Sequence, residues 1–452
     1  MIRALQSFIK VLFGNTSSIV SEHQFTRDIL VVFCIQGFAL ITSLAISLII
    51  TNLLGAAAYG TFSYGFSWVN LLAVFSCMGY EQLALKEIPS YRLQQRGDLI
   101  RGYFRHSIKM VAIVSVATSL LLFAATFYFN IPEDDILRKG LWLAIPVLPL
   151  IAFINLRLSW IRSFHFNALS QLPDKVVRPA IFLAAIAVGY FILKENLSIH
   201  IVIILSGASI LAAYVISKYL TAKKIESEFR EIPPSFLRWQ WTKVAFSLLL
   251  VNGIYFYLSQ LQIILLGSLT DARSTGIYAI ASRLSDLEGY MLFAINVVLA
   301  PVISRLFAEK SMAELQRVIT SSLRIGFMLS LPVIICFLFF PLFFLNFFGD
   351  EFGDGEFALI LLTISQVVNF ATGSVGYLLT MTGHHRSAIQ LLILCALLTT
   401  LLSILLIPDF GVNGAAIASA TNNIVLNVLM AIVVYRRLGI NATLLNWKIG
   451  KT

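Results

Sequence analysis

The chain has 452 residues, of which 58% are hydrophobic and 12% are charged, with a formal net charge of +10. A soluble domain of this length would carry about a quarter charged residues, so the composition excludes a soluble enzyme. The basic residues are scattered between apolar runs, a distribution that suits anionic lipid headgroups and argues against nucleic acid as a partner.

The first 28 residues are predicted to form a cytoplasmic segment whose short apolar helix face rests on the membrane surface, and no cleavable signal peptide is visible. Twelve apolar runs follow, each long enough to cross a bilayer, which needs ~20 mainly apolar residues. The predicted spans are 29–53, 60–79, 109–129, 140–157, 178–193, 199–219, 244–266, 276–299, 323–347, 357–380, 387–407 and 414–435.

Basic residues fall almost entirely on one side of these runs. Threading the spans from an internal N-terminus places 28 of the 33 Lys and Arg residues inside and leaves Arg283 within a span. The four outside are Arg138, Lys139, Lys194 and Arg273. Basic loops stay in the cytoplasm, so this bias predicts a multi-pass protein of the cytoplasmic (inner) membrane with both termini cytoplasmic.

A long internal loop divides the spans into two sets of six. Residues 29–220 form a predicted N-terminal lobe, 221–243 a cytoplasmic linker, 244–435 a C-terminal lobe, and 436–452 a cytoplasmic tail. The Leu-Leu-Gly that closes span one at Gly55 recurs at the end of span seven at Gly267. The sequence therefore predicts an all-α polytopic membrane protein with two pseudo-symmetric six-helix lobes, and a substrate path between them near the midplane.

Span eight contains the most informative polar cluster. Arg283, Asp286 and Tyr290 are spaced to share one helix face, while Glu288 points elsewhere. A charge at this depth costs at least ~2.5–3.5 kcal/mol, so such groups usually face an aqueous cavity or a partner. Two interpretations stay open: a structural Arg283–Asp286 pair that locks span eight to a neighbour, and a functional cavity.

Two further arginines lie at the inner ends of spans. Arg157 closes span four and Arg178 opens span five, and guanidinium groups bind phosphate oxygens in bidentate fashion. Positive-inside anchoring is the alternative explanation, although Arg157 is expected to reach into a cavity. Gln36 and Gln262 are uncharged polar residues within spans; such residues mostly bond across helices, and a few could line a sugar path.

Motifs for bound cofactors are absent from the sequence. There is no GxxxxGK[ST] and no HExxH, and the four cysteines lie inside apolar runs. We therefore predict no catalytic residue, no metal and no cofactor. Uphill transport would draw on a proton or sodium gradient, or on another protein.

Several segments together resemble one family of membrane proteins. Leu54-Gly55 with Tyr59-Gly60, then Leu266-Gly267 with Gly276-Ile277-Tyr278, and finally the run from Pro408 to Ala418, are similar in order and spacing to the polysaccharide transporters, or O-antigen flippases. These belong to the multidrug/oligosaccharidyl-lipid/polysaccharide exporter superfamily. The resemblance covers nearly the whole chain, although each motif alone is weak.

The resemblance implies two six-helix lobes that work by alternating access. It also implies a lipid-linked oligosaccharide substrate, usually on undecaprenyl pyrophosphate, and a polysaccharide polymerase and chain-length regulator as partners. The carried unit would belong to O-antigen, capsule or exopolysaccharide. Many relatives have an acidic residue in span seven near the position of Gln262, so Asp286 or Glu288 would have to replace it in ion coupling.

Two other functions remain as alternatives. A cation-coupled drug exporter of the same superfamily would share the fold, but the arginines near the spans favour an anionic substrate. A membrane-embedded polymerase or glycosyltransferase would need a sizeable aqueous loop, and the predicted outer loops are about ten residues or fewer. A flippase for the peptidoglycan precursor usually has fourteen spans and ranks lower.

Overall fold

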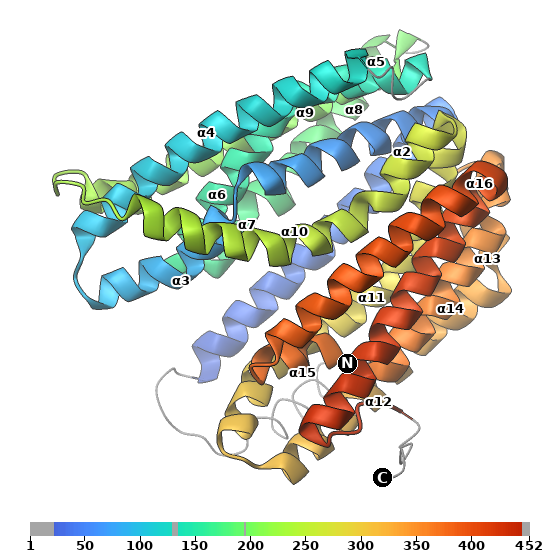
Figure 1. The fold of residues 1–452 in the computed structure, drawn as a ribbon. Helices are drawn as coiled ribbons and strands as arrows, with labels where there is room; N and C mark the ends of the chain where they lie inside the picture. The colour runs from blue at the N-terminus through green and yellow to red at the C-terminus, as the bar shows by residue number, and fades with distance from the viewer. Residues whose placement is uncertain (1–21, 129–133, 194–195, 445–452) are drawn as a thin grey trace.

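A computed structural model describes residues 22–128, 134–193 and 196–444. Helices make up nearly all of these residues, and no strand occurs among them. Figure 1 shows the helices in two groups, one from the N-terminal half (blue to green) and one from the C-terminal half (orange to red). The predicted surface-lying helix in residues 1–21 lies outside the described residues.

The N-terminal group contains eight helices. They are α2 (Glu22–Ser76), α3 (Tyr80–Leu93), α4 (Gly97–Tyr128), α5 (Asp135–Ala144), α6 (Leu148–Ser163), α7 (Asn167–Leu172), α8 (Arg178–Leu193) and α9 (Ile199–Lys224). A single π-helical turn, η2 (Pro173–Val177), joins α7 to α8. Helix α8 covers the same residues as predicted span five.

The C-terminal group follows a connection that contains two prolines. It contains α10 (Arg238–Leu269), α11 (Ala272–Ala308), α12 (Met312–Phe339), α13 (Pro341–Asn346), the 3₁₀ turn η5 (Asp350–Gly355), α14 (Glu356–Thr372), α15 (Val375–Met381) and α16 (His385–Leu438). Helix α10 crosses between the two groups in Figure 1.

Twelve crossings follow from the helix lengths. In the described part of the chain, nine helical segments are long and apolar enough to span a membrane. Helices α2 and α16 have 55 and 54 residues, about twice what one crossing needs, and each breaks at a glycine with positive φ, Gly55 at 82° and Gly411 at 50°. Each therefore supplies two crossings. Helix α11 adds another, because its 37 residues are long enough to span although its charged cluster lowers the hydropathy.

Two predicted spans are interrupted. Span nine ends as α12 at Phe339 and resumes as the short α13 from Pro341. Span ten ends as α14 at Thr372, because Gly373 turns the backbone with a φ of 63°, and α15 starts at Val375. The continuous runs expected over 323–347 and 357–380 are therefore wrong in detail, since hydropathy alone does not register these backbone breaks.

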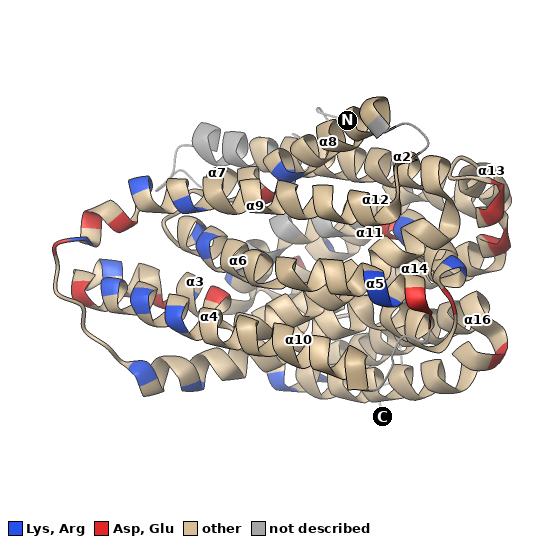
Figure 2. Cartoon of the chain, turned by 90° about the horizontal axis from the view of Figure 1, so that it is seen from above, with Lys and Arg blue, Asp and Glu red and all other residues tan. Residues whose placement is uncertain are grey.

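The two ends of the bundle differ in charge. In Figure 2 Lys and Arg gather toward the end that holds α3 and the α3–α4 connection, which we call the basic end. The opposite end, called the acidic end, holds the Gly55 break, the start of α11 and η5. Arg273 there donates to Asp354 at 2.6 Å, and this hydrogen bond raises the pKa of the guanidinium.

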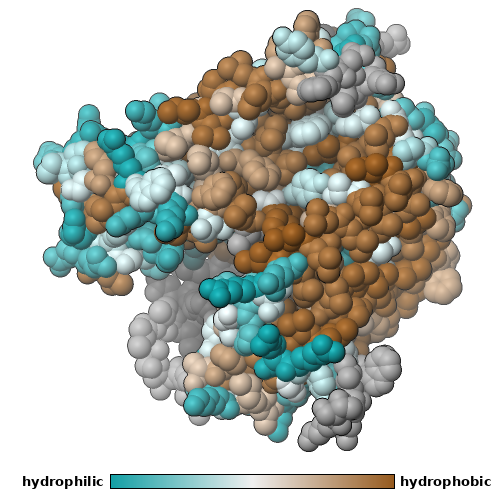
Figure 3. All heavy atoms as spheres, in the orientation of Figure 1, coloured by the Kyte–Doolittle hydropathy of each residue, from teal (hydrophilic) through white to brown (hydrophobic). Residues whose placement is uncertain are grey.

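Apolar side chains cover the flanks between these ends. Along α16, Leu397, Leu401 and Leu405 are 66%, 57% and 59% exposed, and their spacing places them on one helix face. Figure 3 shows a broad hydrophobic surface over the C-terminal helices. Such a surface is too large for a protein in water and matches contact with lipid tails.

At the acidic end the lobes meet along α2 and α11, and α10 also packs on α3 elsewhere. Gly60 and Gly276 allow the two backbones to touch: a Cβ on Gly60 would lie 1.8 Å from the carbonyl oxygen of Ala272, and one on Gly276 would lie 2.0 Å from that of Ala56. The Glu351 carboxylate accepts a hydrogen bond from the backbone N–H of Ala56 at 3.2 Å. This end of the interface is closed.

Candidate functional site

Arg283 lies where the two lobes join. Helix α11 starts at Ala272, so Arg283 is eleven residues, about 16 Å, from the acidic end of that helix. Its Nη1 donates to the Tyr59 hydroxyl at 2.7 Å, and its Nη2 donates to Ser43 Oγ. Both acceptors belong to α2, one on each side of the Gly55 break. Arg283 therefore links the C-terminal lobe to two crossings of the N-terminal lobe.

The hydrogen-bond acceptors of the Arg283 guanidinium are uncharged hydroxyls. Tyr59 is buried, and its hydroxyl also bonds to Ser47 Oγ at 3.0 Å. Asp286, one turn further along α11, is exposed, and Arg283 is the nearby charge that acts on it, although the two side chains do not form an ion pair. The structural Arg283–Asp286 pair considered from the sequence is thus not formed. A half-buried guanidinium held by hydroxyls suits a bidentate anion such as a phosphate.

The remaining predicted residues of α11 occupy different environments. Glu288 is fully buried within the C-terminal lobe. Tyr290 follows on the same helix, and its side chain lies outside the described part of the structure. Arg283 and Asp286 lie one turn apart on α11, as their spacing predicts, and Asp286 is exposed. Glu288 is instead buried in the C-terminal lobe.

Arg157 is not near this junction. It is 6% exposed, its Nη1 contacts Glu226 at 2.9 Å and Thr221 Oγ1 at 2.7 Å, and its guanidinium lies over the Trp160 ring. The expectation that Arg157 reaches into a cavity is not met, because Glu226, in the turn after α9, neutralises it. Sequence inspection missed this pair because the partners are 69 residues apart.

We expect Arg157→Leu to act on stability. The substitution removes a buried cation that Thr221 and Glu226 bind, and losing hydrogen bonds to a charged group costs about 1.5–3 kcal/mol. Because Glu226 is about one-third exposed, water would recover part of that loss. Thermal unfolding in detergent should show a lower midpoint, while transport by the folded fraction stays near that of the parent. Loss of transport at unchanged stability would instead place Arg157 in the transport path.

Arg178 and Gln36 lie together in the N-terminal lobe. Arg178 Nη1 contacts Asp174 at 3.1 Å, and Lys175 contacts the same carboxylate at 3.3 Å. Gln36, on α2, donates to Gln171 Oε1 of α7 at 3.1 Å. The π-helical turn brings these groups to the junction of α7 and α8, beside α2. Asp174 and Gln171 are partners that the sequence did not single out.

Gln262 lies in the interior of the C-terminal lobe. It is buried on α10, and its Oε1 accepts a hydrogen bond from Ser403 of α16 at 3.0 Å. Its Nε2 has no partner among the described residues. This interhelical bond is the role that the sequence favoured for uncharged polar residues within spans.

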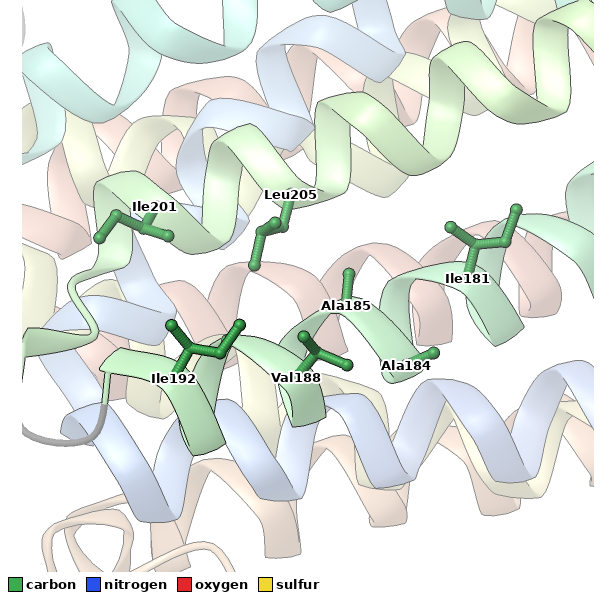
Figure 4. A pocket seen from close by; sticks show the side chains of 8 residues that line it. Ile181, Ala184, Ala185, Val188, Ile192, Ile201 and Leu205 are labelled. Carbon is green, nitrogen blue, oxygen red and sulfur yellow. The ribbon is translucent and has the colours of Figure 1, made fainter.

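A groove of about 540 Å³ lies between α8 and α9. Figure 4 shows its side chains: Ile181, Ala184, Ala185, Val188, Ile192, Ile201 and Leu205. All of them are apolar, so the groove cannot solvate a sugar or a phosphate. The candidate polar site is therefore the Arg283 junction and not this groove.

The fold belongs to the two-lobe membrane transporters. The structure superposes on an inward-facing multidrug resistance MATE family transporter of the MOP superfamily with a TM-score of 0.72, at 14% identity, covering 88% of this chain and 98% of that one. It also superposes on the lipid II flippase MurJ in an inward closed conformation, with a TM-score of 0.69 at 12% identity, covering 90% and 86%. These likenesses show the same two-lobe helical fold.

Residues 25–307 match the family model described as "Polysaccharide biosynthesis protein". The chain belongs to this family. A probable low-salt glycan biosynthesis flippase of Haloferax volcanii is 24% identical over 248 residues, which is 54% of this chain and 51% of that protein. The chain thus matches about half the length of that relative.

Proposed function

We propose that the protein moves a polyprenyl-pyrophosphate-linked oligosaccharide across the cytoplasmic membrane, with undecaprenyl pyrophosphate as the expected carrier. The unit would be a repeat of O-antigen, capsule or exopolysaccharide, passed on to a polymerase and a chain-length regulator. The supporting observation is Arg283, a cation at the lobe junction whose hydrogen-bond partners, Tyr59 and Ser43, are neutral.

A pyrophosphate-linked sugar cannot cross ~30 Å of hydrocarbon alone, because its charges and hydroxyls would lose their hydration. A cation between the lobes offsets part of that loss for the phosphate. The lipid tail can remain in the bilayer, which demands no polar contacts. Family membership and the flippase named among the relatives support this substrate class.

The charge pattern supports an orientation with the basic end in the cytoplasm. The contact of Gly60 with Gly276 then closes the outer side, as in an inward-facing transporter. Separation of these glycines, with closure at the basic end, would expose the headgroup outside. A proton or sodium gradient would drive this cycle, as for an ion-coupled exporter of the same fold.

Purified protein in liposomes provides the test. The probe is a fluorescent disaccharide on undecaprenyl pyrophosphate, and movement is measured as protection from a membrane-impermeant quencher. We expect protein-dependent transfer between leaflets, with no chemical change to the probe. Export of a cationic dye without transfer of the probe would favour the drug-exporter alternative, and a new glycosidic bond would favour an enzyme.

A further inference from the structure

The groove between α8 and α9 is accessible from within the bilayer. Val188 and Ile192, which line it, are 56% and 74% exposed. Among the spanning segments in the described part of the chain, the one that contains α8 is the least buried. Side chains exposed at the level of a span meet lipid tails and not water. A lipid chain can therefore enter this groove sideways, without leaving the membrane.

Small residues open the groove along one face of α8. Ala184, Ala185 and Gly189 contribute at most a methyl group each, between branched neighbours such as Ile181 (Figure 4). A Cβ on Gly189 would already lie 3.4 Å from Leu205 Cδ1 of α9, so a larger side chain there would occupy the groove. The groove is thus apolar and notched, with a volume of about 540 Å³.

A basic residue lies on the same face of α8 as the groove. Steps of three and four residues place five positions on this face: Arg178, Ile181, Ala185, Val188 and Ile192. Arg178 begins α8 and precedes Ile181, the first residue of the groove, by about 4.5 Å along the helix axis. An anionic group bound at Arg178 would therefore have its attached chain directed along the groove.

The start of α8 has more positive than negative charge. Arg178 and Lys175 both contact the carboxylate of Asp174, at 3.1 and 3.3 Å, so two cations share one anion. The side chains of Arg178 and Lys175 are 27% and 45% exposed, which leaves room for a further ligand. A guanidinium and an ammonium group beside each other suit a phosphate or pyrophosphate. The groove thus has an anion-binding end and an apolar length, as an amphiphilic ligand requires.

We propose that this region is a loading site for the lipid carrier. Arg178 and Lys175 bind its pyrophosphate, and the α8–α9 groove binds the isoprene units nearest to that pyrophosphate. The loading site rests on the proposed function, from which it takes the substrate class. It adds where the lipid chain binds, on the flank of the N-terminal lobe and apart from the Arg283 junction.

Helix α2 connects the loading site to the lobe junction. It packs against both η2 and α8, and its Gln36 donates to Gln171 of α7 beside the loading site. Ser43, which accepts a hydrogen bond from Arg283, follows Gln36 by seven residues on the same face of α2. Seven residues are two helical turns, about 10 Å. A pyrophosphate released by Arg178 would therefore have a short path along α2 to Arg283.

The occupant that fits this groove is a polyprenyl chain and not a phospholipid. Lipid tails are as apolar as leucine, so an ordinary acyl chain gains nothing by leaving its neighbours for the groove. A polyprenyl chain has a methyl branch in every isoprene unit, and the notches beside Ala185 and Gly189 can accept such branches. Its pyrophosphate also has more negative charge than a phosphodiester, and attachment of the bound headgroup keeps the chain at the groove.

Photocrosslinking of the full chain in lipid nanodiscs tests the location. The probe is an undecaprenyl-pyrophosphate disaccharide with a diazirine in the isoprene unit nearest to the pyrophosphate. We expect labelled peptides from α8 and α9. Unlabelled undecaprenyl phosphate should compete, whereas an equal amount of phosphatidylglycerol, or of a pyrophosphate on a straight saturated chain of the same length, should not. Labelling confined to other helices, or equal competition by phosphatidylglycerol, would overturn the loading site.

Two identical substitutions on α8 separate the groove from the rest of the helix. Ala185→Leu fills the groove, and probe binding should weaken about tenfold, the order that one misfitting methylene group produces in an apolar pocket. Ala187→Leu is the matched control, because Ala187 is exposed on another face of α8 and does not line the groove. Its binding should equal that of the parent. If Ala185→Leu does not fold, Gly189→Leu fills the groove from the next turn. Parent-like binding by a folded groove variant would exclude the groove.

A second pair of variants tests the anion-binding end. Arg178→Gln should weaken binding of the probe and reduce its dependence on salt, because a charge-assisted contact to the pyrophosphate is lost. Lys218→Gln is the control, since Lys218 is an exposed cation near the basic end of α9. Both the affinity and the salt dependence of Lys218→Gln should equal those of the parent. Unchanged binding by Arg178→Gln would remove the arginine from the loading site.

These measurements report binding and not transfer, so the two proposals fail separately. If the probe labels α8 and α9 as expected but does not move between leaflets in liposomes, the transport function is wrong and the lipid-binding site remains. If the probe moves but labels other helices, only the loading site is wrong.

Discussion

Arg283→Ala should reduce transfer of the undecaprenyl-pyrophosphate probe about a hundredfold or more, without loss of protein from the membrane. A hydrogen bond to a charged group contributes about 1.5–3 kcal/mol, and a bidentate contact to a phosphate contains two. The substitution leaves the Tyr59 hydroxyl with its bond to Ser47, which limits the cost in stability. Initial rates in liposomes at equal protein content give the measurement.

Two variants separate the charge from its geometry. Arg283→Lys keeps the charge but loses the planar fork, so we expect an intermediate rate. Arg273→Ala is the matched control, because Arg273 begins the same helix, is about half exposed and contacts Asp354. Its rate should stay within about twofold of the parent, since exposed ion pairs contribute little. Parent-like transfer by Arg283→Ala would exclude the arginine from the substrate site.

Gly276→Leu should prevent closure of the acidic end and stop transport. Even the Cβ of the new side chain would lie 2.0 Å from the carbonyl oxygen of Ala56, far inside van der Waals contact, and that neighbour is backbone that cannot rotate away. The lobes would have to separate along α2 and α11. Spin labels on Leu53→Cys and Phe347→Cys, with the native cysteines replaced, report this closure, because Asn52 donates to the Phe347 carbonyl across the lobes. Their distance should be longer in Gly276→Leu, and transfer of the probe should fall to background.

Gly37→Ala provides the control for the glycine experiment. Gly37 lies on α2 as well, and a Cβ placed there meets nothing within 4 Å. The added methyl group should leave both the label distance and the transfer rate unchanged, and replacing glycine within a helix generally favours the helix. If the label distance in Gly276→Leu equalled that of the parent, the contact between Gly60 and Gly276 would not be the surface that closes the acidic end.

The spans were predictable because lipid imposes a strict rule on the backbone. Every peptide group in hydrocarbon must be bonded within its own helix, so long apolar runs become helices of the required length. Helix α8 matches its predicted span. The breaks at Phe340 and Gly373 were missed because a protein interior tolerates a broken helix where hydropathy detects no change.

The candidate site was predictable only in part. Charges deep in span eight usually face a cavity or a partner, and this reasoning singled out Arg283 and Glu288, whose roles stay predictions. The identity of the partner decides the role, and partners come from distant segments. Tyr59 is 224 residues away from Arg283, and Glu226 is 69 residues from Arg157.

The sequence by itself determined the environment of this protein: apolar runs and one-sided basic loops require a multi-span protein of the membrane, because lipid excludes unpaired polar groups and an anionic leaflet retains cations. The tertiary structure alone decided which buried charges are neutralised. Arg157 pairs with the carboxylate of Glu226. Arg283 donates to the hydroxyls of Tyr59 and Ser43 at the lobe junction, and the polar neighbour of Glu288 is Thr363. The strength of a charge interaction depends on atomic distance and on access to water, and only the packed helices set both.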